Sequence, residues 1–189
     1  MVNSKLSVRQ ITISALMIAA LIVCTQISIN LPGGIPFTMQ TFAVALIGFL
    51  LGLKTGTLVV GVYLILGLIG FPVFSNFGSG PAKIFGPTGG YLIGFIPMVV
   101  LCGLAAGLIS KNKSPATYIW AVLLSLTGLI CCHLLGIIWL AARTEMNLVT
   151  ATISGSLPFI IKDIASVILG YITAEILAKQ LNRILNKAS

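Results

Sequence analysis

Apolar residues fill six long runs of this chain, and only short polar or glycine-rich segments separate them. A helix that crosses a membrane needs about 20 apolar residues, with a range of about 17 to 25. Each run falls within that range, so the pattern predicts an all-α fold with six transmembrane helices. The runs cover residues 11–29, 37–53, 55–71, 91–109, 118–142 and 157–178, with a tight turn at Lys54 between the second and third.

The composition agrees with an integral membrane protein. Hydrophobic residues make up 58% of the 189 residues and charged residues only 7%, whereas a soluble domain carries roughly 25% charged residues. Such a chain cannot cover its surface with polar groups, so we expect a multi-pass protein of the cell membrane, surrounded by lipid bilayer. No repeat or linker interrupts the pattern, and residues 1–189 are expected to form a single domain.

The basic residues predict which side of the membrane each segment faces. Lysine and arginine gather on the cytoplasmic side of membrane proteins, and placing both termini in the cytoplasm puts most of them there. These cytoplasmic residues are Lys5, Arg9, Lys54, Lys111, Lys113, Lys179, Arg183 and Lys187. Only Lys83 and Arg143 then fall outside, with Lys162 just inside the last span. The same bias accounts for the net charge of +8 without nucleic acid as a partner.

Three irregular segments share the outer side in this arrangement. They cover residues 30–36, 71–90 and 143–156. The stretch from Phe71 to Phe95, FPVFSNFGSGPAKIFGPTGGYLIGF, mixes glycines and prolines with aromatic residues. Glycine permits close approach of the backbone and proline fixes its path. We therefore interpret the outer loops as a cap over a small-molecule site, with this stretch as its shaped lid.

Asp163 is the most informative single residue. It lies about six residues into the last predicted helix, or roughly 9 Å at 1.5 Å per residue. An ionisable group at that depth is unfavourable unless it is paired, so it is a candidate for ligand contact. Its helix face is small, polar and aromatic, as in a cavity wall, and comprises Ser156, Phe159, Ser166 and Gly170. The alternative is an internal ion pair with Lys83 or Arg143.

Lys162 precedes Asp163 but lies about 100° away around the helix, so the two side chains are not expected to face each other. Two roles remain open for Lys162. Its long side chain either extends to the outer lipid head groups or contacts the ligand.

Two further polar clusters open predicted helices from the outer side. In Phe37-Thr38-Met39-Gln40-Thr41, Gln40 offers one acceptor and two donors, although the threonines can serve simply as helix caps. The run Gly86-Pro-Thr-Gly-Gly-Tyr91 begins the fourth helix. Free amides and the helix dipole favour an anion such as a carboxylate there.

The remaining reactive residues indicate neither an enzyme nor a metal site. The three acids, Glu145, Asp163 and Glu175, are too dispersed for paired carboxylate chemistry. The four cysteines lie in apolar runs without metal-binding spacing. The sole histidine, His133, is expected to be packed or hydrogen-bonded within its helix. The sequence also lacks the charge rings and filter motifs of channels. These features favour a binding protein without a cofactor.

Three motifs resemble BioY, the biotin-specific substrate-capture subunit (S-component) of energy-coupling factor transporters. They are Pro36-Phe-Thr-Met-Gln-Thr41, Gly86-Pro-Thr-Gly-Gly-Tyr91 and Pro158-Phe-Ile-Ile-Lys-Asp163, and the likeness runs through all six predicted spans. The resemblance implies high-affinity capture of biotin on the outer side, with energy from a separate transmembrane coupling protein and two ATPases. It also implies that an Ala-x-x-x-Ala pattern, here Ala15 and Ala19, contacts the coupling protein.

Biotin has a ureido ring, an apolar sulfur ring and a carboxylate tail. The candidate ligand residues are Gln40, Phe74, Asn76, Lys83, Thr88, Gly89, Tyr91, Trp139, Phe159, Lys162 and Asp163. Asp163 with Asn76 or Gln40 is expected to satisfy the ureido edge, and the aromatic residues to pack the bicyclic ring. Lys83, or amides near Thr88 and Gly89, are expected to hold the carboxylate. The alternatives are an S-component for thiamine or riboflavin, and a small solo carrier or channel.

Overall fold

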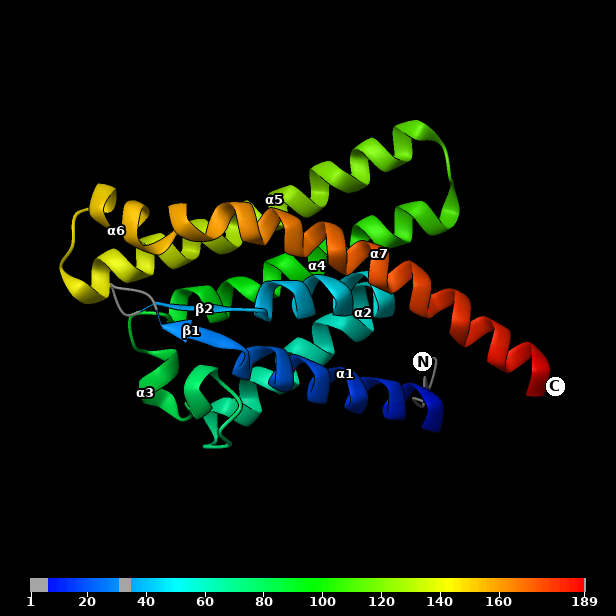
Figure 1. The fold of residues 1–189 in the computed structure, drawn as a ribbon, viewed down its shortest axis with the longest axis horizontal. Coiled ribbons are helices and arrows are strands. Elements are labelled where there is room, and N and C mark those ends of the chain that lie inside the picture. Colours follow the sequence, from blue (N-terminus) through cyan, green and yellow to red (C-terminus); the bar gives the residue numbers. More distant parts are fainter. Residues whose placement is uncertain (1–6, 31–34, 189) are drawn as a thin grey trace, which may run out of the picture.

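The computed structural model describes residues 7–30 and 35–188, and in these ranges it consists almost entirely of helices (Figure 1). The helices are α1 (Val8–Gln26), α2 (Gln40–Leu68), the short 3₁₀ helix η1 (Ser75–Phe77), α3 (Pro81–Ile84), α4 (Gly89–Lys111), α5 (Pro115–Thr144), α6 (Leu148–Gly155) and α7 (Leu157–Ala188). A two-stranded antiparallel hairpin, β1 (Ser28–Asn30) and β2 (Pro36–Thr38), lies between α1 and α2. The predicted helical membrane fold is confirmed, with this small hairpin as an addition.

Within the described residues, five helices are long and apolar enough to cross a membrane, namely α1, α2, α4, α5 and α7. Helix α2 is divided at Gly52, whose φ of 72° and ψ of −176° are not helical. The chain reverses direction there. The proximity of the two arms shows this, since a Cβ added to Gly56 would lie 3.2 Å from the carbonyl oxygen of Ile47. Along a straight helix these residues would be about 13 Å apart. The second and third predicted runs thus correspond to the two arms of α2, and the turn comes slightly before Lys54.

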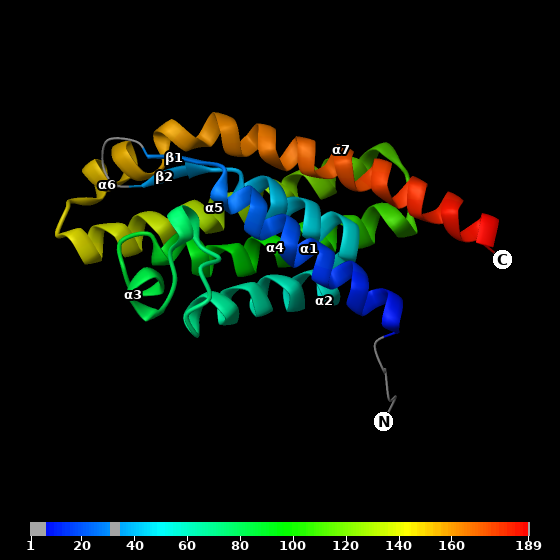
Figure 2. The ribbon, with the colours of Figure 1, turned by 60° about the horizontal axis from the view of Figure 1, so that its bottom comes forward.

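The connecting segments lie at two opposite ends of the bundle (Figures 1 and 2). One end carries β1, β2, α3 and α6, and the other carries the start of α1, the end of α7 and the α4–α5 connection. The sequence predicts three irregular segments at one end, and their described parts do lie together. The third of these is not irregular, however, because α6 forms there. This helix begins where the Asn147 side chain accepts a hydrogen bond from the Thr150 amide at 2.7 Å.

Small residues let the central helices approach each other closely. Helix α4 packs against both α2 and α5. A Cβ at Gly48 would lie 2.6 Å from the Cβ of Cys102, and one at Gly94 would lie 2.8 Å from the Cα of Cys132. Glycine at such positions allows tight helix packing in lipid, where no hydrophobic force drives helices together. The close packing fixes α4 between α2 and α5.

Residues 69–88, between α2 and α4, form an ordered segment that we call the cover. The ring of Phe74 anchors it, fully buried against Gly67 and 5.5 Å between centroids from the ring of Tyr63. The Gly80 amide donates a hydrogen bond to the Gly67 carbonyl at 2.7 Å. These contacts hold the cover on the second arm of α2.

A side chain of α1 also holds the cover. Gln26 donates a hydrogen bond to the carbonyl of Phe74 at 3.1 Å and accepts one from the amide of Phe77 at 3.0 Å. Asn76 and Phe77 have φ values of 57° and 54°, in the left-handed region that non-glycine residues seldom adopt. The Gln26 hydrogen bonds therefore hold both ends of the segment from Phe74 to Phe77, which contains these two residues.

Candidate functional site

A narrow cavity lies between α2, α4, α5 and α7, and its wall also includes residues of β2 and the cover, together with Ile35 and with Gly155 of α6. Eight of the residues predicted to bind a ligand line it, namely Gln40, Phe74, Lys83, Thr88, Tyr91, Phe159, Lys162 and Asp163. Folding thus brings the three sequence clusters and the cover to one place. The cavity is the site at which ligand contact is expected.

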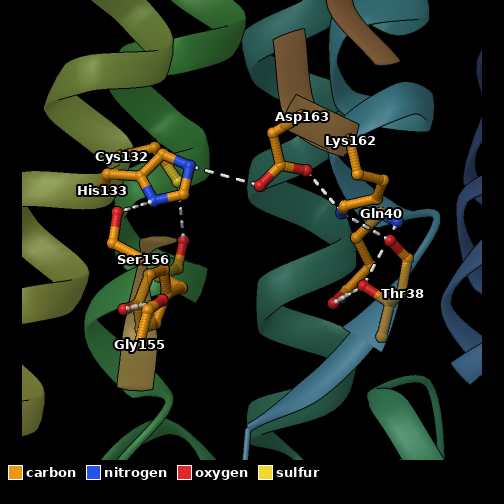
Figure 3. A network of polar contacts seen from close by, with 9 residues as sticks. Thr38, Gln40, Cys132, His133, Gly155, Ser156, Lys162 and Asp163 are labelled. Carbon is orange, nitrogen blue, oxygen red and sulfur yellow. Dashed lines mark hydrogen bonds and ion pairs between the residues drawn. The ribbon is translucent and has the colours of Figure 1, made fainter. Parts of the chain in front are cut away.

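Asp163 lies in the wall formed by α7 and is 5% exposed. Its Oδ1 atom faces the ammonium group of Lys162, and its Oδ2 atom lies 3.2 Å from Nε2 of His133 (Figure 3). The helix face expected to form a cavity wall is buried at Ser156, Phe159, Ser166 and Gly170, but of these four only Phe159 lines the cavity. A buried carboxylate needs such partners, because an unpaired charge away from water is strongly unfavourable.

The direction of the Lys162 side chain contradicts the expectation that it would not face Asp163. Its ammonium group does meet Asp163, because the four-carbon side chain is long enough to fold back across the helix turn. It does not extend to the lipid head groups, since the side chain is 15% exposed. Instead, Nζ donates a hydrogen bond to the Thr38 carbonyl at 2.8 Å and lies 5.0 Å from the centre of the Phe37 ring. Lys162 therefore joins α7 to β2 inside the cavity wall.

His133 extends this network to α5. Its Nδ1 atom lies 2.8 Å from the hydroxyl of Ser156, and its ring meets the edge of Tyr91 with centroids 6.2 Å apart. A hydrogen-bonded imidazole agrees with the sequence, but its place in the cavity wall was missed. The available signal was the one that identified Asp163, an ionisable side chain in the middle of an apolar span.

Gln40 lines the cavity, but both ends of its amide are engaged. Its Nε2 atom donates to the Tyr63 hydroxyl at 2.8 Å, and its Oε1 atom accepts from the Thr38 hydroxyl at 3.1 Å. The Thr38 hydroxyl also accepts a hydrogen bond from the main-chain amide of Gln40 at 3.4 Å, but Met39 is the N-cap of α2 and no side chain caps this helix, so the capping role considered for the threonines is not seen. These bonds make Gln40 a member of the wall as well as a candidate ligand residue.

The beginning of α4 offers fewer free amides than the sequence predicts. The Gly89 amide donates to the Gly86 carbonyl and the Tyr91 amide to the Thr88 carbonyl, both at 3.1 Å. Gly89 packs so closely against α3 that a side chain would not fit, and it is outside the cavity lining. Lys83 of α3 is therefore the stronger candidate for an anionic group on this side.

Asn76 and Trp139 hold the cover and do not line the cavity. Asn76 accepts a hydrogen bond from the Ser28 hydroxyl at 3.0 Å, and the Trp139 indole donates to the Gly86 carbonyl at 3.0 Å. Arg143 lies over the Trp139 ring, 5.3 Å from its centre, so the ion pair considered for it with the acid of α7 does not form.

Ala15 and Ala19 lie on an exposed face of α1, whereas Leu21 and Thr25 are buried against the bundle. The two alanines leave a shallow surface on which another helix can approach. No cluster of three histidine, cysteine, aspartate or glutamate side chains that could hold a metal ion occurs in the part of the chain that the structure describes.

The chain is similar to proteins of one family over most of its length. The BioY family model matches residues 1–183. A probable biotin transporter BioY of Pyrococcus horikoshii is 40% identical over 167 residues, which are 88% of this chain and 94% of that protein. The biotin transporter BioY of Thermotoga maritima is 36% identical over 171 residues, 90% of this chain and 96% of that protein.

A solved structure is similar over the same extent. The crystal structure at 2.1 Å of the S-component for biotin from an ECF-type ABC transporter superposes with a TM-score of 0.83 at 32% sequence identity. The superposition covers 95% of each chain. These relatives are transport proteins, so the expectation that the chain is not an enzyme is confirmed.

Proposed function

The chain belongs to the BioY family, and we propose that it captures biotin with high affinity on the outer side of the cell membrane. It does so as the S-component of an energy-coupling factor transporter. The observation that carries this proposal is the cavity and its charges. Lys83, Lys162 and Asp163 line it, so two cations and one anion leave a net charge of +1 when His133 is neutral. That charge suits a ligand with a single carboxylate.

Asp163 and Lys162 together fit the ureido ring. An ionised carboxylate has about four lone-pair sites, and His133 and Lys162 use only part of them. Asp163 can therefore accept from the ureido N–H groups. Lys162 has three N–H donors, of which Thr38 and Asp163 take two, so the third is free for the ureido carbonyl. This assignment needs no hydrogen bond from Gln40, whose amide is already engaged.

The apolar part and the tail of biotin fit the remaining lining. Phe74, Tyr91 and Phe159 present aromatic surface to the cavity and suit the bicyclic ring. Lys83 and Thr88 line the cover side and suit the carboxylate. Recognition of both polar ends would favour biotin over ligands that match only one of them.

Ligand entry requires the cavity to open. The cover closes one side of it, through Phe74, Ser75, Lys83 and Thr88. The cover is the part that we expect to move. It is held by the buried ring of Phe74, by side-chain hydrogen bonds that involve Gln26, Asn76 and Trp139, and by main-chain hydrogen bonds, whereas the helices around the cavity are packed along their length.

The direction of capture follows from the charges at the two ends of the bundle. The cavity lies at the end with β2 and α3, and the start of α1 and the end of α7 lie at the opposite end (Figure 1). The basic residues near those helix ends favour the cytoplasm. We therefore infer six crossings, with each arm of α2 crossing once, both termini in the cytoplasm and the cavity facing outward.

Release into the cell is assigned to partner proteins. The energy would come from a transmembrane coupling protein and two ATPases, and the exposed face with Ala15 and Ala19 is the surface proposed to contact the coupling protein. Capture and delivery would then depend on different residues of the same chain.

Calorimetric titration of the purified protein in detergent tests the ligand. We expect tight one-to-one binding of biotin, weaker binding of desthiobiotin because it lacks the closed sulfur ring, and no binding of thiamine or riboflavin. Tight binding of thiamine or riboflavin instead would show that the ligand is a different vitamin, while the proposed role as an S-component would stand. Absence of any binding by a folded sample would reject the proposed ligand, and uptake by cells without the ATPases would favour a solo carrier.

Replacement of the two alanines tests the partner face. We expect Ala15→Trp and Ala19→Trp to lose co-purification with the coupling protein and to keep biotin binding. Ile176→Trp is the control, because Ile176 is exposed on a different helix, α7. Equal loss of co-purification in all three variants would show that bulk at the membrane-facing surface, and not this face, is responsible.

A further inference from the structure

His133 lies where three helices meet, and its two ring nitrogens have different partners. From α5 the ring reaches Ser156, the residue between α6 and α7, and Asp163 on α7 (Figure 3). We propose that His133 is a positioning residue that orients the Asp163 carboxylate toward the ligand. This inference rests on the proposed function of the cavity, and it adds a residue whose contacts with biotin are indirect.

The partners determine which nitrogen carries the proton. An ionised carboxylate only accepts hydrogen bonds, so Nε2 of His133, 3.2 Å from Oδ2 of Asp163, carries the hydrogen. In a neutral imidazole the other nitrogen is then an acceptor. Nδ1 lies 2.8 Å from the Ser156 hydroxyl, which therefore donates to it. Ser156 selects the tautomer in which His133 can donate to Asp163.

His133 and Lys162 hold the Asp163 carboxylate from opposite sides, and the Thr41 side chain is a further hydrogen-bond partner. Lys162 faces Oδ1 and His133 faces Oδ2, so rotation of the carboxylate would break both. The Tyr91 hydroxyl also donates a hydrogen bond to the Gly155 carbonyl at 2.6 Å. This bond joins α4 to the end of α6, next to Ser156. Without His133, the carboxylate is free to turn both oxygens toward Lys162. It would then present less of its acceptor capacity to a ligand.

The sequence makes this arrangement directly observable. The chain contains one histidine, so intact protein labelled with ¹⁵N-histidine and purified without a histidine tag gives imidazole signals from His133 alone. We expect Nε2 to carry a proton. Asp163→Asn should change the Nε2 signal, and Ser156→Ala should change the Nδ1 signal. A ring protonated only on Nδ1, or an Nε2 signal that Asp163→Asn leaves unchanged, would overturn the proposal.

Biotin affinity gives the second readout. His133→Leu removes the donor and should weaken biotin binding about tenfold to a hundredfold, the range for a lost hydrogen bond to a charged group. His133→Gln, whose amide nitrogen reaches about the position of Nε2, should recover most of that loss. Thr127→Val is the matched control on α5, because that hydroxyl is exposed and bonds only the Leu123 carbonyl. It should stay within about threefold of the native affinity.

The rescue separates positioning from simple support of the fold. If folded His133→Leu protein binds biotin within about threefold of native, or if folded His133→Gln loses as much as His133→Leu, the proposal is overturned. A failure of the proposed function is distinguishable from a failure of this inference, because in that case the native protein itself would not bind biotin. The ¹⁵N signals of the native protein keep the proposal falsifiable even when a His133 variant does not fold.

Discussion

The cavity has two sides that are built in different ways. One side, which we call the polar wall, consists of side chains on long helices, namely His133, Lys162 and Asp163. His133 and Asp163 are buried and Lys162 is partly buried, and His133 and Lys162 both pair with Asp163. On the other side, the cover is a segment between helices, held by main-chain hydrogen bonds, by Gln26 and by the buried ring of Phe74. The polar wall is formed by packed helices, whereas the cover is held by separate hydrogen bonds and by one buried ring.

This difference indicates a division of tasks within one site. Side chains on helices are placed more accurately than those on loops, which suits recognition of a polar ligand. Segments with few buried contacts open at lower free energy than packed helices. We therefore expect changes in the polar wall to act mainly on equilibrium affinity, and changes in the cover to act mainly on stability and on the rates of entry and release.

The largest effect is expected from Asp163→Asn. The substitution keeps the shape of the side chain but removes its charge, and it leaves Lys162 in the cavity wall without its counter-ion. We expect the affinity for biotin to fall about 100-fold or more, or about 2.7 kcal/mol, as for other buried charge pairs that lose one member. Calorimetric titration measures this directly.

Glu175→Gln is the matched control, because it makes the same chemical change on the same helix. The Glu175 side chain is 41% exposed, and its carboxylate lies 4.0 Å from Lys179 outside the cavity. Exposed pairs of this kind contribute about 0–1 kcal/mol, so biotin binding should be unchanged. If both variants lost affinity equally, net charge on α7 and not the polar wall would control binding.

The next largest effect is expected from Gly67→Ala in the seat of the cover. The new methyl group would occupy the space of the Phe74 ring, so the ring must move. Overpacking of this kind costs about 1–3 kcal/mol, and we expect a lower midpoint of thermal unfolding and faster release of biotin. Gly61→Ala on the same arm of α2 is the control, since nothing lies within 4 Å of its added Cβ. It should leave stability unchanged or raise it, and equal losses in both variants would contradict the seating of Phe74.

A smaller effect is expected from Gln26→Leu, which removes both hydrogen bonds between α1 and the cover. Two such bonds contribute about 1–2 kcal/mol, so biotin should dissociate about 5–30 times faster, with more rapid amide exchange across residues 73–78. Thr12→Val is the control on α1, because its hydroxyl bonds only the Val8 carbonyl. An unchanged dissociation rate in Gln26→Leu would show that the cover opens without breaking these bonds.

The helical architecture was predictable because lipid imposes a strong constraint on sequence. Runs of about 20 apolar residues identify spans whatever their neighbours are, and the tight turn expected at Lys54 corresponds to the break in α2 at Gly52. The hairpin of Ser28–Asn30 and Pro36–Thr38 was missed, because strands of three residues carry almost no periodic signal. Helix α6 was missed because its mixed sequence resembles a loop, and its N-cap Asn147 gives only a local signal.

The site was predictable in part, for a related reason. Asp163 is conspicuous because a carboxylate in a span needs a partner, but the sequence does not say which one. The contact of Asp163 with His133 depends on how α5 and α7 are rotated about their axes, and that with Lys162 depends on a side-chain conformation. Asn76 and Trp139 have suitable chemistry and lie close by. Tertiary packing directs Asn76 toward Ser28 of β1 and Trp139 toward Gly86 of the cover, and neither residue lines the cavity.

The smallest effect is expected from Phe77→Asn, and it tests whether the cover is strained. Phe77 has a φ of 54° and is 72% exposed, so it bears left-handed strain with little burial to offset it. Asparagine tolerates this conformation better than phenylalanine and keeps the amide that bonds Gln26. We expect stability to rise by about 0.5–1 kcal/mol and biotin to enter and leave more slowly, with equilibrium affinity unchanged.

Phe85→Asn separates strain from the loss of an exposed aromatic ring. Phe85 is also exposed and also lies in the cover, but its φ of −88° is ordinary. The substitution there should therefore give no gain in stability. If Phe77→Asn and Phe85→Asn both lowered the midpoint of thermal unfolding, contact of these rings with the membrane would outweigh the strain at Phe77. If it changed equilibrium affinity instead of the rates, the cover would share in recognition, and the division between the two sides of the cavity would fail.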